Sequence, residues 1–199
     1  THGYRAYGQT SDKDLGASGS CNLNVACEEA DGWENEISSA ARMVVGGNSW
    51  CSGQMINNTN NDGTPYFLSA NHCYTNPGQV VFWFNYESDT CEDPSVPPEH
   101  DAISGATDVA RSAPSDFWLM ELNQEPPADY GVYLSGWNRT TEPEVEGYIF
   151  GVHHPSGDIK KFSYLFDGVT TSEYLGDTGS GDTHWRVGSW ADGTTTEGG

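Results

Sequence analysis

The stretch Tyr66-Phe67-Leu68-Ser69-Ala70-Asn71-His72-Cys73 decides how the rest of the chain is interpreted. It begins as the apolar run of a β-strand, continues through small residues, and then presents a histidine followed at once by a cysteine. The pattern predicts an imidazole at the end of a strand. A disulfide between Cys73 and Cys51 would fix the backbone of His72, as an acid–base group requires.

A second stretch, Pro114-Ser115-Asp116-Phe117-Trp118-Leu119-Met120-Glu121-Leu122, places an aspartate at the head of a strongly apolar strand. A carboxylate at the mouth of a buried strand is costly unless it is hydrogen-bonded. A bond from an imidazole N–H would satisfy Asp116 and would also orient a catalytic base, so we expect Asp116 to be the partner of His72. Asp108 is the rival candidate, because its surroundings are polar on one side only. Asp101 is disfavoured because it lies in an acidic, Pro-rich loop.

Short apolar runs separated by turn residues recur along the chain and predict an all-β fold of the sandwich or barrel type. The expected strands are residues 41–45, 50–56, 66–70, 80–86, 117–122, 132–137, 148–153, 160–166 and 184–190. Only residues 31–42 have a helical face, and that face is weak.

Charge and composition exclude several functional classes. The 199 residues contain 29 acidic and 8 basic side chains, for a formal net charge of −21. Such a surface repels the phosphates of nucleic acids and anionic lipids, so we expect neither nucleic acid nor membrane as a partner. The acidity fits either tolerance of a salty exterior or attraction of a cationic substrate, and composition does not separate the two.

The cysteines indicate an oxidising compartment. None of them shows the C-x₂-C spacing of a zinc site, and all lie in the first 91 residues of a loop-rich chain. They therefore predict disulfides and a secreted, extracellular protein. Their number, five, is odd, so one thiol is either free or paired outside this chain.

From about residue 18 to the end, the chain resembles the trypsin-like serine peptidases, and in particular the bacterial lysyl endopeptidases. The stretch around His72 is the most specific match. The other matching segments follow in family order: Ser18-Gly19-Ser20-Cys21-Asn22, Asn57-Asn58-Thr59, Ser115-Asp116-Phe117, Gly136-Trp137-Asn138-Arg139, His153-His154-Pro155 and Thr196-Glu197-Gly198-Gly199.

The resemblance implies an all-β fold of two six-stranded barrels, with the second barrel incomplete in this chain. Residues 1–17 would be a leader or a strap over the surface. Residues 18–125 would form the first barrel, which carries His72 and Asp116. Residues 126–199 would form part of the second barrel.

The same resemblance implies roles for individual residues. His72 would be the general base and Asp116 would orient it. Cys27 would pair with Cys91, and Cys51 with Cys73. Cys21 would pair with a cysteine that this chain does not contain, which would explain the odd number.

The resemblance also places the nucleophilic serine about two residues beyond Gly199, in a Gly-x-Ser-Gly segment of a C-terminal continuation or a companion chain. Within the chain, Gly176-Asp177-Thr178-Gly179-Ser180-Gly181 has some likeness to the Gly-Asp-Ser-Gly turn of trypsin-like enzymes. Thr178 occupies the position of the nucleophile there, and Ser180 follows two residues late. We therefore expect this segment to be an ordinary surface turn.

The resulting hypothesis is a secreted serine endopeptidase that hydrolyses polypeptides by acyl transfer and needs no cofactor. The resemblance suggests cleavage after basic residues, above all lysine. Gly176 weakens this preference, because it stands where the family has a tryptophan. Two other classes stay open: an inactive homologue that binds peptides or partner proteins, and a carbohydrate-binding β domain that uses Trp118, Trp137 or Trp185.

Two further motifs favour structural roles. Adjacent histidines on an extended strand point to opposite faces, so His153 and His154 would not ligate one metal ion. The run from Asn58 to Gly63 resembles the start of a calcium loop, but Ser69 stands where the closing glutamate should be, so we expect a hairpin turn. We therefore expect no metal site.

Overall fold

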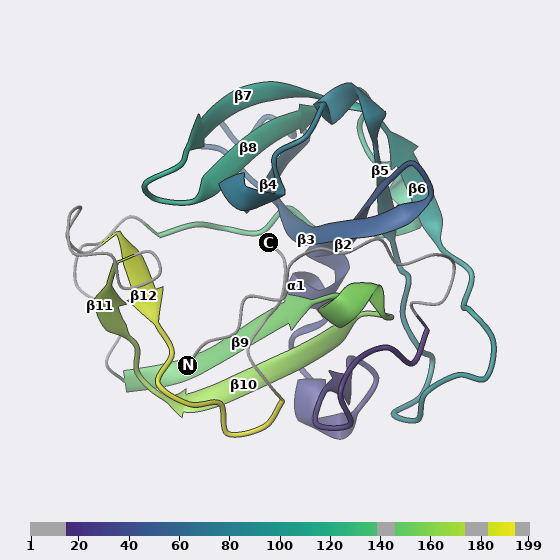
Figure 1. The fold of residues 1–199 in the computed structure, drawn as a ribbon, viewed down its shortest axis with the longest axis vertical. Helices are drawn as coiled ribbons and strands as arrows, with labels where there is room; N and C mark the ends of the chain where they lie inside the picture. The colour runs from purple at the N-terminus through teal and green to yellow at the C-terminus, as the bar shows by residue number, and fades with distance from the viewer. Residues whose placement is uncertain (1–14, 139–145, 174–182, 194–199) are drawn as a thin grey trace.

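The computed structural model describes residues 15–138, 146–173 and 183–193 (Figure 1). Strands predominate in it and the α-helix has only six residues, which confirms the all-β prediction. No helix in the described ranges is long and apolar enough to span a membrane. The elements, with η for a 3-10 helix, are β1 (Leu23–Asn24), η1 (Glu28–Ala30), α1 (Glu34–Ser39), β2 (Ala40–Val45), β3 (Asn48–Ile56), β4 (Tyr66–Ala70), η2 (Asn71–Cys73), η3 (Pro77–Gln79), β5 (Val80–Phe84), β6 (Asp101–Ser104), β7 (Ala106–Ser112), β8 (Phe117–Leu122), η4 (Ala128–Tyr130), β9 (Glu146–His153), η5 (Pro155–Gly157), β10 (Lys161–Asp167), β11 (Thr170–Ser172) and β12 (His184–Arg186).

The larger sheet is antiparallel and strongly curved (Figure 1). Its strand order is β6-β5-β2-β3-β4-β8-β7, so β6 and β7 are its two edges. These edge strands are consecutive in the chain and are separated only by Gly105, whose φ of +80° favours glycine. Gly105 donates its amide to Val80 O at 2.7 Å and accepts from the amide of Asn123 at 3.0 Å. The bent β6–β7 segment thus brings the two edges of the seven-stranded sheet toward each other, and the sheet curls into a barrel-like shape.

The core of this barrel follows from alternation along its strands. In β5, Val80, Phe82 and Phe84 are buried, while the residues between them are partly exposed. The rings of Phe67 and Phe82 meet edge to face, with centroids 4.7 Å apart. Burying each such phenylalanine stabilises the fold by about 2–3 kcal/mol, so the core fixes the register of the strands that lead to His72.

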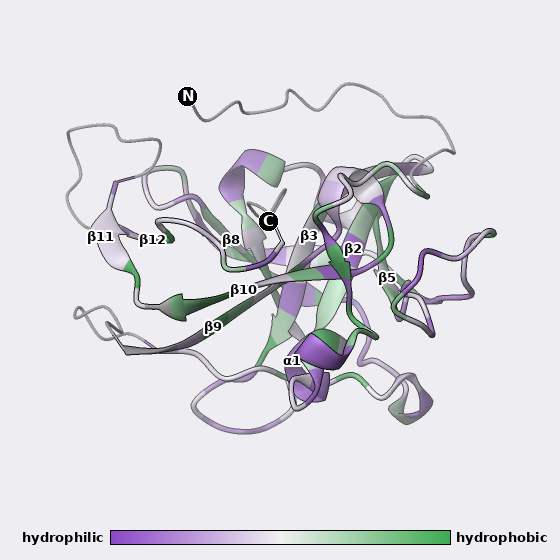
Figure 2. Ribbon diagram, turned by 90° about the horizontal axis from the view of Figure 1, so that it is seen from below, coloured by the Kyte–Doolittle hydropathy of each residue, from purple (hydrophilic) through white to green (hydrophobic). Residues whose placement is uncertain are grey.

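A second sheet, in the order β1-β10-β9, lies below the barrel in Figure 1. Stacked aromatic rings cover it: the Phe150 ring lies 4.8 Å from the Trp33 ring and 4.9 Å from the Phe162 ring. The helix α1 beside this sheet is largely hydrophilic in Figure 2, whereas β9 and β10 carry hydrophobic segments. Residues 23–37, which the resemblance placed in the first barrel, supply β1 and part of this second core. The remaining pair, β11 and β12, forms a separate two-stranded sheet.

A seam of buried polar groups joins the larger sheet to α1 and to the segment that follows β9. Ser135 Oγ donates to or accepts from Ser39 Oγ at 2.9 Å, and the amide of His154 donates to Ser52 Oγ at 2.9 Å. Residues 132–137, expected as a strand, form only a single bridge there, between Ser135 and Ile56. The amide of Ser135 donates to Met55 O at 3.0 Å and its carbonyl accepts from the amide of Asn57 at 2.8 Å, so the segment is held without a ladder.

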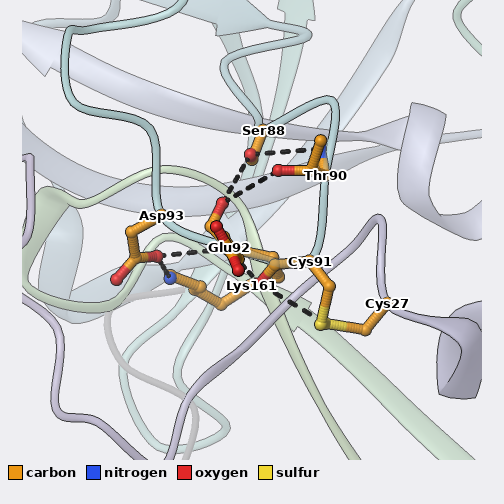
Figure 3. Close-up of a disulfide and its surroundings, with 8 residues drawn as sticks. Cys27, Ser88, Thr90, Cys91, Glu92, Asp93 and Lys161 are labelled. Carbon is orange, nitrogen blue, oxygen red and sulfur yellow. Dashed lines mark hydrogen bonds and ion pairs between the residues drawn. A yellow bond between two sulfur atoms is a disulfide. The ribbon is translucent and has the colours of Figure 1, made fainter.

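A long loop after β5 is fastened to the second sheet at two points (Figure 3). The disulfide Cys27–Cys91 connects it to the residues that follow β1. Two residues further along the loop, the carboxylate of Asp93 lies 2.5 Å from the ammonium of Lys161 at the start of β10. The disulfide and the ion pair therefore hold the same loop against the same sheet.

Residues near the start of the described chain also contact the second half. The carboxylate of Asp158, which is fully buried, accepts from the amide of Gly16 at 2.9 Å and from the hydroxyl of Ser18 at 2.5 Å. The amides of Ser18 and Ile159 donate to it as well, at 3.1 and 2.8 Å. Four donors thus compensate the charge of a carboxylate that forms no ion pair within the described ranges.

Candidate active site

His72 is presented by a single helical turn at the end of β4. The strand ends at Ala70, and η2 follows, closed by the amide of Tyr74, which donates to Asn71 O at 2.9 Å. The disulfide Cys51–Cys73 ties this turn to β3, and the indole N–H of Trp50 donates to Cys73 O at 2.6 Å. The backbone on the C-terminal side of His72 is therefore anchored twice, which an acid–base group requires if its ring is to keep one orientation.

Asp116 occupies the turn between β7 and β8 in a left-handed conformation, with a φ of +46°. Aspartate adopts this region more readily than most residues, but at a cost of roughly 1–3 kcal/mol that neighbouring contacts must offset. Its carbonyl accepts from the amide of Asn71 at 3.0 Å, and its Oδ1 accepts from the amide of His72 at 2.8 Å. The strained turn is thus bonded to the backbone of η2.

The side chains of His72 and Asp116 meet directly. His72 Nδ1 and Asp116 Oδ2 are 2.7 Å apart, and the aspartate side chain is 8% exposed against 23% for the histidine. An ionised carboxylate only accepts, so the geometry implies that Nδ1 carries the proton and that Nε2 carries the lone pair. The pair is thus arranged as a general base held by a carboxylate.

The two aspartates weighed against Asp116 are engaged elsewhere. Asp108 accepts from the indole N–H of Trp118 at 2.6 Å. Asp101 accepts from the side-chain amide of Asn85 at 2.7 Å. Asp101 was expected in a loop, and that expectation is wrong, because it is the first residue of β6.

One cluster beside the site has the composition of a metal centre without its chemistry. Cys51, His72 and Cys73 bring potential ligand atoms within 4.8 Å of one another. The two sulfur atoms are bonded to each other, however, and a disulfide offers no thiolate to a metal ion. The cluster therefore does not fit a zinc site.

The other histidine pair lies apart from His72 in the structure, at the end of β9. Burial, helped by the charge of Lys161, lowers the pKa of His153 to about 4. Burial and the charge of Lys160 likewise hold the pKa of His154 well below its ordinary value, although the carbonyl of Asp158, 3.0 Å from His154 Nδ1, acts in the opposite direction. Both imidazoles are therefore kept neutral inside the protein.

The calcium-like run forms a self-contained turn. Asn58 donates to Asp62 Oδ1 at 2.7 Å, and the hydroxyl of Thr64 donates to the same oxygen at 2.6 Å. These bonds, that from Thr64 first, lower the pKa of the Asp62 carboxyl. The oxygen that would bind a cation thus already closes the turn.

The remaining candidates are one cysteine and three tryptophans, which differ in how far they are exposed, and Ser180. Cys21 is exposed and carries a free thiol. Trp118 is fully buried and cannot serve as a sugar platform, whereas Trp137 and Trp185 are exposed. Ser180 and its Gly-rich segment lie outside the described residues.

Sequence reasoning missed two residues beside the dyad. The guanidinium of Arg111 on β7 lies 3.9 Å from the ring centroid of Tyr74, which directly follows η2. The Tyr74 ring in turn meets Trp118 edge to face at 5.3 Å. The apolar pattern gave no signal for β7, since most of its residues are polar or exposed, and without that strand Arg111 could not be placed.

Comparisons with known proteins show the family of the chain. Residues 15–199 match the family described as "Lysyl endopeptidase, C-terminal domain". A lysyl endopeptidase of Pseudomonas aeruginosa is 33% identical over 164 residues, which cover 75% of this chain and 35% of that protein. The chain thus spans about a third of the length of this relative.

Among solved structures, the human heparin binding protein aligns with a TM-score of 0.43 and 16% identity. The alignment covers 68% of this chain and 62% of that one.

Proposed function

Because the chain belongs to the lysyl endopeptidase C-terminal domain family, we propose that it carries the base and the orienting carboxylate of a serine endopeptidase. The observation that carries the proposal is the contact of 2.7 Å between His72 Nδ1 and Asp116 Oδ2. Acyl transfer by serine needs a base whose proton-accepting nitrogen is set by a carboxylate on its other nitrogen. This pair has that arrangement.

In the proposed reaction, His72 Nε2 removes the proton from a serine hydroxyl while the serine oxygen attacks the carbonyl carbon of the peptide bond. The imidazolium then returns this proton to the departing amine, and an acyl-enzyme remains. Water, deprotonated by the same imidazole, releases the acid and regenerates the serine. Asp116 stays ionised and stabilises the imidazolium in both steps.

We place the serine and the backbone N–H groups of the oxyanion hole in a segment that follows Gly199. Two features support this placement. The family resemblance puts a Gly-x-Ser-Gly turn directly after the Gly198-Gly199 pair, and the exposed Cys21 thiol is available to a cysteine of the same segment. The two disulfides within the described residues support secretion.

Lysine is the proposed residue on the amino side of the scissile bond. The name of the bacterial relative supports this choice, and the strongly acidic surface would attract cationic peptides. Matched peptides that carry lysine, arginine or leucine at this position test the preference, and lysine should give the highest kcat/KM.

The experiment that tests the proposed function is covalent labelling of the full-length protein with a peptidyl diphenyl phosphonate. One label per molecule should be found on a serine, and His72→Ala should abolish both labelling and peptide hydrolysis, with turnover reduced by at least a thousandfold.

His100→Ala is the matched control, since His100 is exposed and stacks on Trp83 in the barrel wall. It should label normally. A folded wild-type protein that neither labels nor cleaves any peptide would instead support the inactive homologue.

A further inference from the structure

A cation and an aromatic ring form a built surface beside the dyad, which we name the Arg111–Tyr74 platform. The Arg111 guanidinium lies 3.9 Å from the Tyr74 ring centroid, close enough for a cation–π contact. Beneath it, the fully buried Trp118 meets the Tyr74 ring, and the Trp118 indole N–H is held by Asp108 at 2.6 Å. The platform therefore rests on a fixed support.

Both members of the platform lie on segments that adjoin the proposed catalytic residues. Tyr74 follows η2, and its amide closes the turn that presents His72. Arg111 pairs across the sheet with Trp118, two residues beyond Asp116. The position of the guanidinium is thus linked to the dyad through short, ordered backbone connections.

The charge of Arg111 is unusual on this surface. Among the basic side chains that the structure describes, only Arg111 and Arg186 are exposed. Lys160 and Lys161 are buried and paired with Glu87 and Asp93. Within the same ranges, no carboxylate lies within ion-pair distance of Arg111. A protein with a net charge of −21 thus keeps, beside its proposed base, an exposed cation that no carboxylate of the described ranges pairs with.

A stacked guanidinium retains the donors in its own plane. When the face of an arginine lies on an aromatic ring, its N–H groups still point outward and can bind both oxygens of a carboxylate. The Tyr74 ring beside this position is partly exposed and can contact the methylene groups of a glutamate or aspartate side chain. The chemistry fits an acidic side chain.

We propose that the Arg111–Tyr74 platform is a substrate subsite that binds an aspartate or glutamate side chain of the polypeptide, within three residues of the scissile bond. This inference rests on the proposed endopeptidase function. The subsite offsets the repulsion that the acidic surface exerts on such a segment, so cleavage sites with a neighbouring acidic residue are accepted.

The test compares peptides that share one cleavable bond and carry glutamate, glutamine or lysine at a single position, scanned over three residues on each side. With the full-length protein, glutamate should exceed glutamine in kcat/KM by about five- to tenfold at one position. The preference should shrink as salt is raised, because the contact is partly exposed.

Arg111→Gln should reduce the glutamate-to-glutamine ratio at that position to about one. Arg111→Lys should restore only part of it, because lysine keeps the charge and loses the planar fork. Arg186→Gln is the matched control, since it removes the other exposed arginine of the described ranges, and it should leave the ratio unchanged. A wild-type protein that cleaves without any charge preference, or an Arg111→Gln variant that keeps the preference, would overturn the inference.

Binding separates this inference from the proposed function. Fluorescence anisotropy of the labelled glutamate and glutamine peptides on the His72→Ala variant needs no turnover. The glutamate peptide should bind about five- to tenfold more tightly, and Arg111→Gln should remove the difference. Equal binding of the two peptides would refute the platform even if the enzyme is active. Unequal binding without hydrolysis by the wild type would refute the proposed function alone.

Discussion

Two groups of histidines in this molecule show how the surroundings of a side chain decide its chemistry. His72 is partly exposed and faces a carboxylate at 2.7 Å. His153 and His154 are buried, and the positive charges of Lys161 and Lys160 act on them. Burial and a nearby cation both disfavour an imidazolium, whereas a carboxylate stabilises one.

The difference teaches that histidine content by itself says little about catalysis here. A base that gains and loses a proton at each turnover needs a partner for its charged form. His72 has that partner, whereas burial and the charges of Lys160 and Lys161 disfavour the charged form of the buried pair. The buried pair instead contributes to the seam of buried polar groups, where the amide of His154 bonds to Ser52.

The substitution with the largest expected effect removes the carboxylate partner of His72. In Asp116→Asn, a side-chain amide can face Nδ1 as a donor, which would move the imidazole proton to Nε2, where it cannot accept the serine proton. We expect kcat to fall by about 10³- to 10⁴-fold, measured by peptide hydrolysis with the full-length protein.

Asp101→Asn is the control for this substitution, because Asp101 bonds to Asn85 in the barrel wall. It should keep its activity. An Asp116→Asn variant within tenfold of the wild type would show that the contact does not set the tautomer.

The second prediction concerns the buried histidines and the pH dependence of the free energy of unfolding. The pKa of His153 is lowered to about 4 in the folded protein, below the ordinary value of about 6.5 in the unfolded chain. The unfolded chain therefore binds a proton first as the pH falls. The stability associated with a neutral His153 is complete above pH 6.5 and is lost between about pH 6.5 and pH 4, by about 3 kcal/mol.

Urea unfolding across this pH range measures the loss, and His153→Leu should make the profile flatter. A slope that persists in full in His153→Leu would assign it to other groups.

The smallest expected effect on stability comes from the hydrogen bond between the amide of His154 and Ser52. Ser52→Ala removes the hydroxyl that accepts from the amide of His154 at 2.9 Å, in a buried position. The N–H would then lack this partner, so we expect a loss of about 1–2 kcal/mol in the free energy of unfolding. Ser38→Ala, which removes an exposed bond to Asn35 O, should cost less than about 0.5 kcal/mol. Equal costs would mean that the seam bond adds no stability.

The local features of this protein could be predicted from the order of its residues. The apolar run before His72 and the apolar run after Asp116 are patterns of neighbouring residues, and alternation reports directly on which side chains face a core. The resemblance added the order of the segments and the expected cysteine pairs. Both kinds of information depend on the identity of residues that are close in the chain.

The features that depend on contacts between distant segments became visible only in the folded chain. The closure at Gly105, the burial of Lys160 and Lys161, the left-handed turn at Asp116 and the stacking of Arg111 on Tyr74 all depend on contacts between distant segments. Polar strands such as β7 carry no hydrophobic alternation, so the sequence does not predict which strands pair with them. The physical reason is that burial of a polar side chain depends on which partner arrives across the fold, and a local pattern does not record that partner.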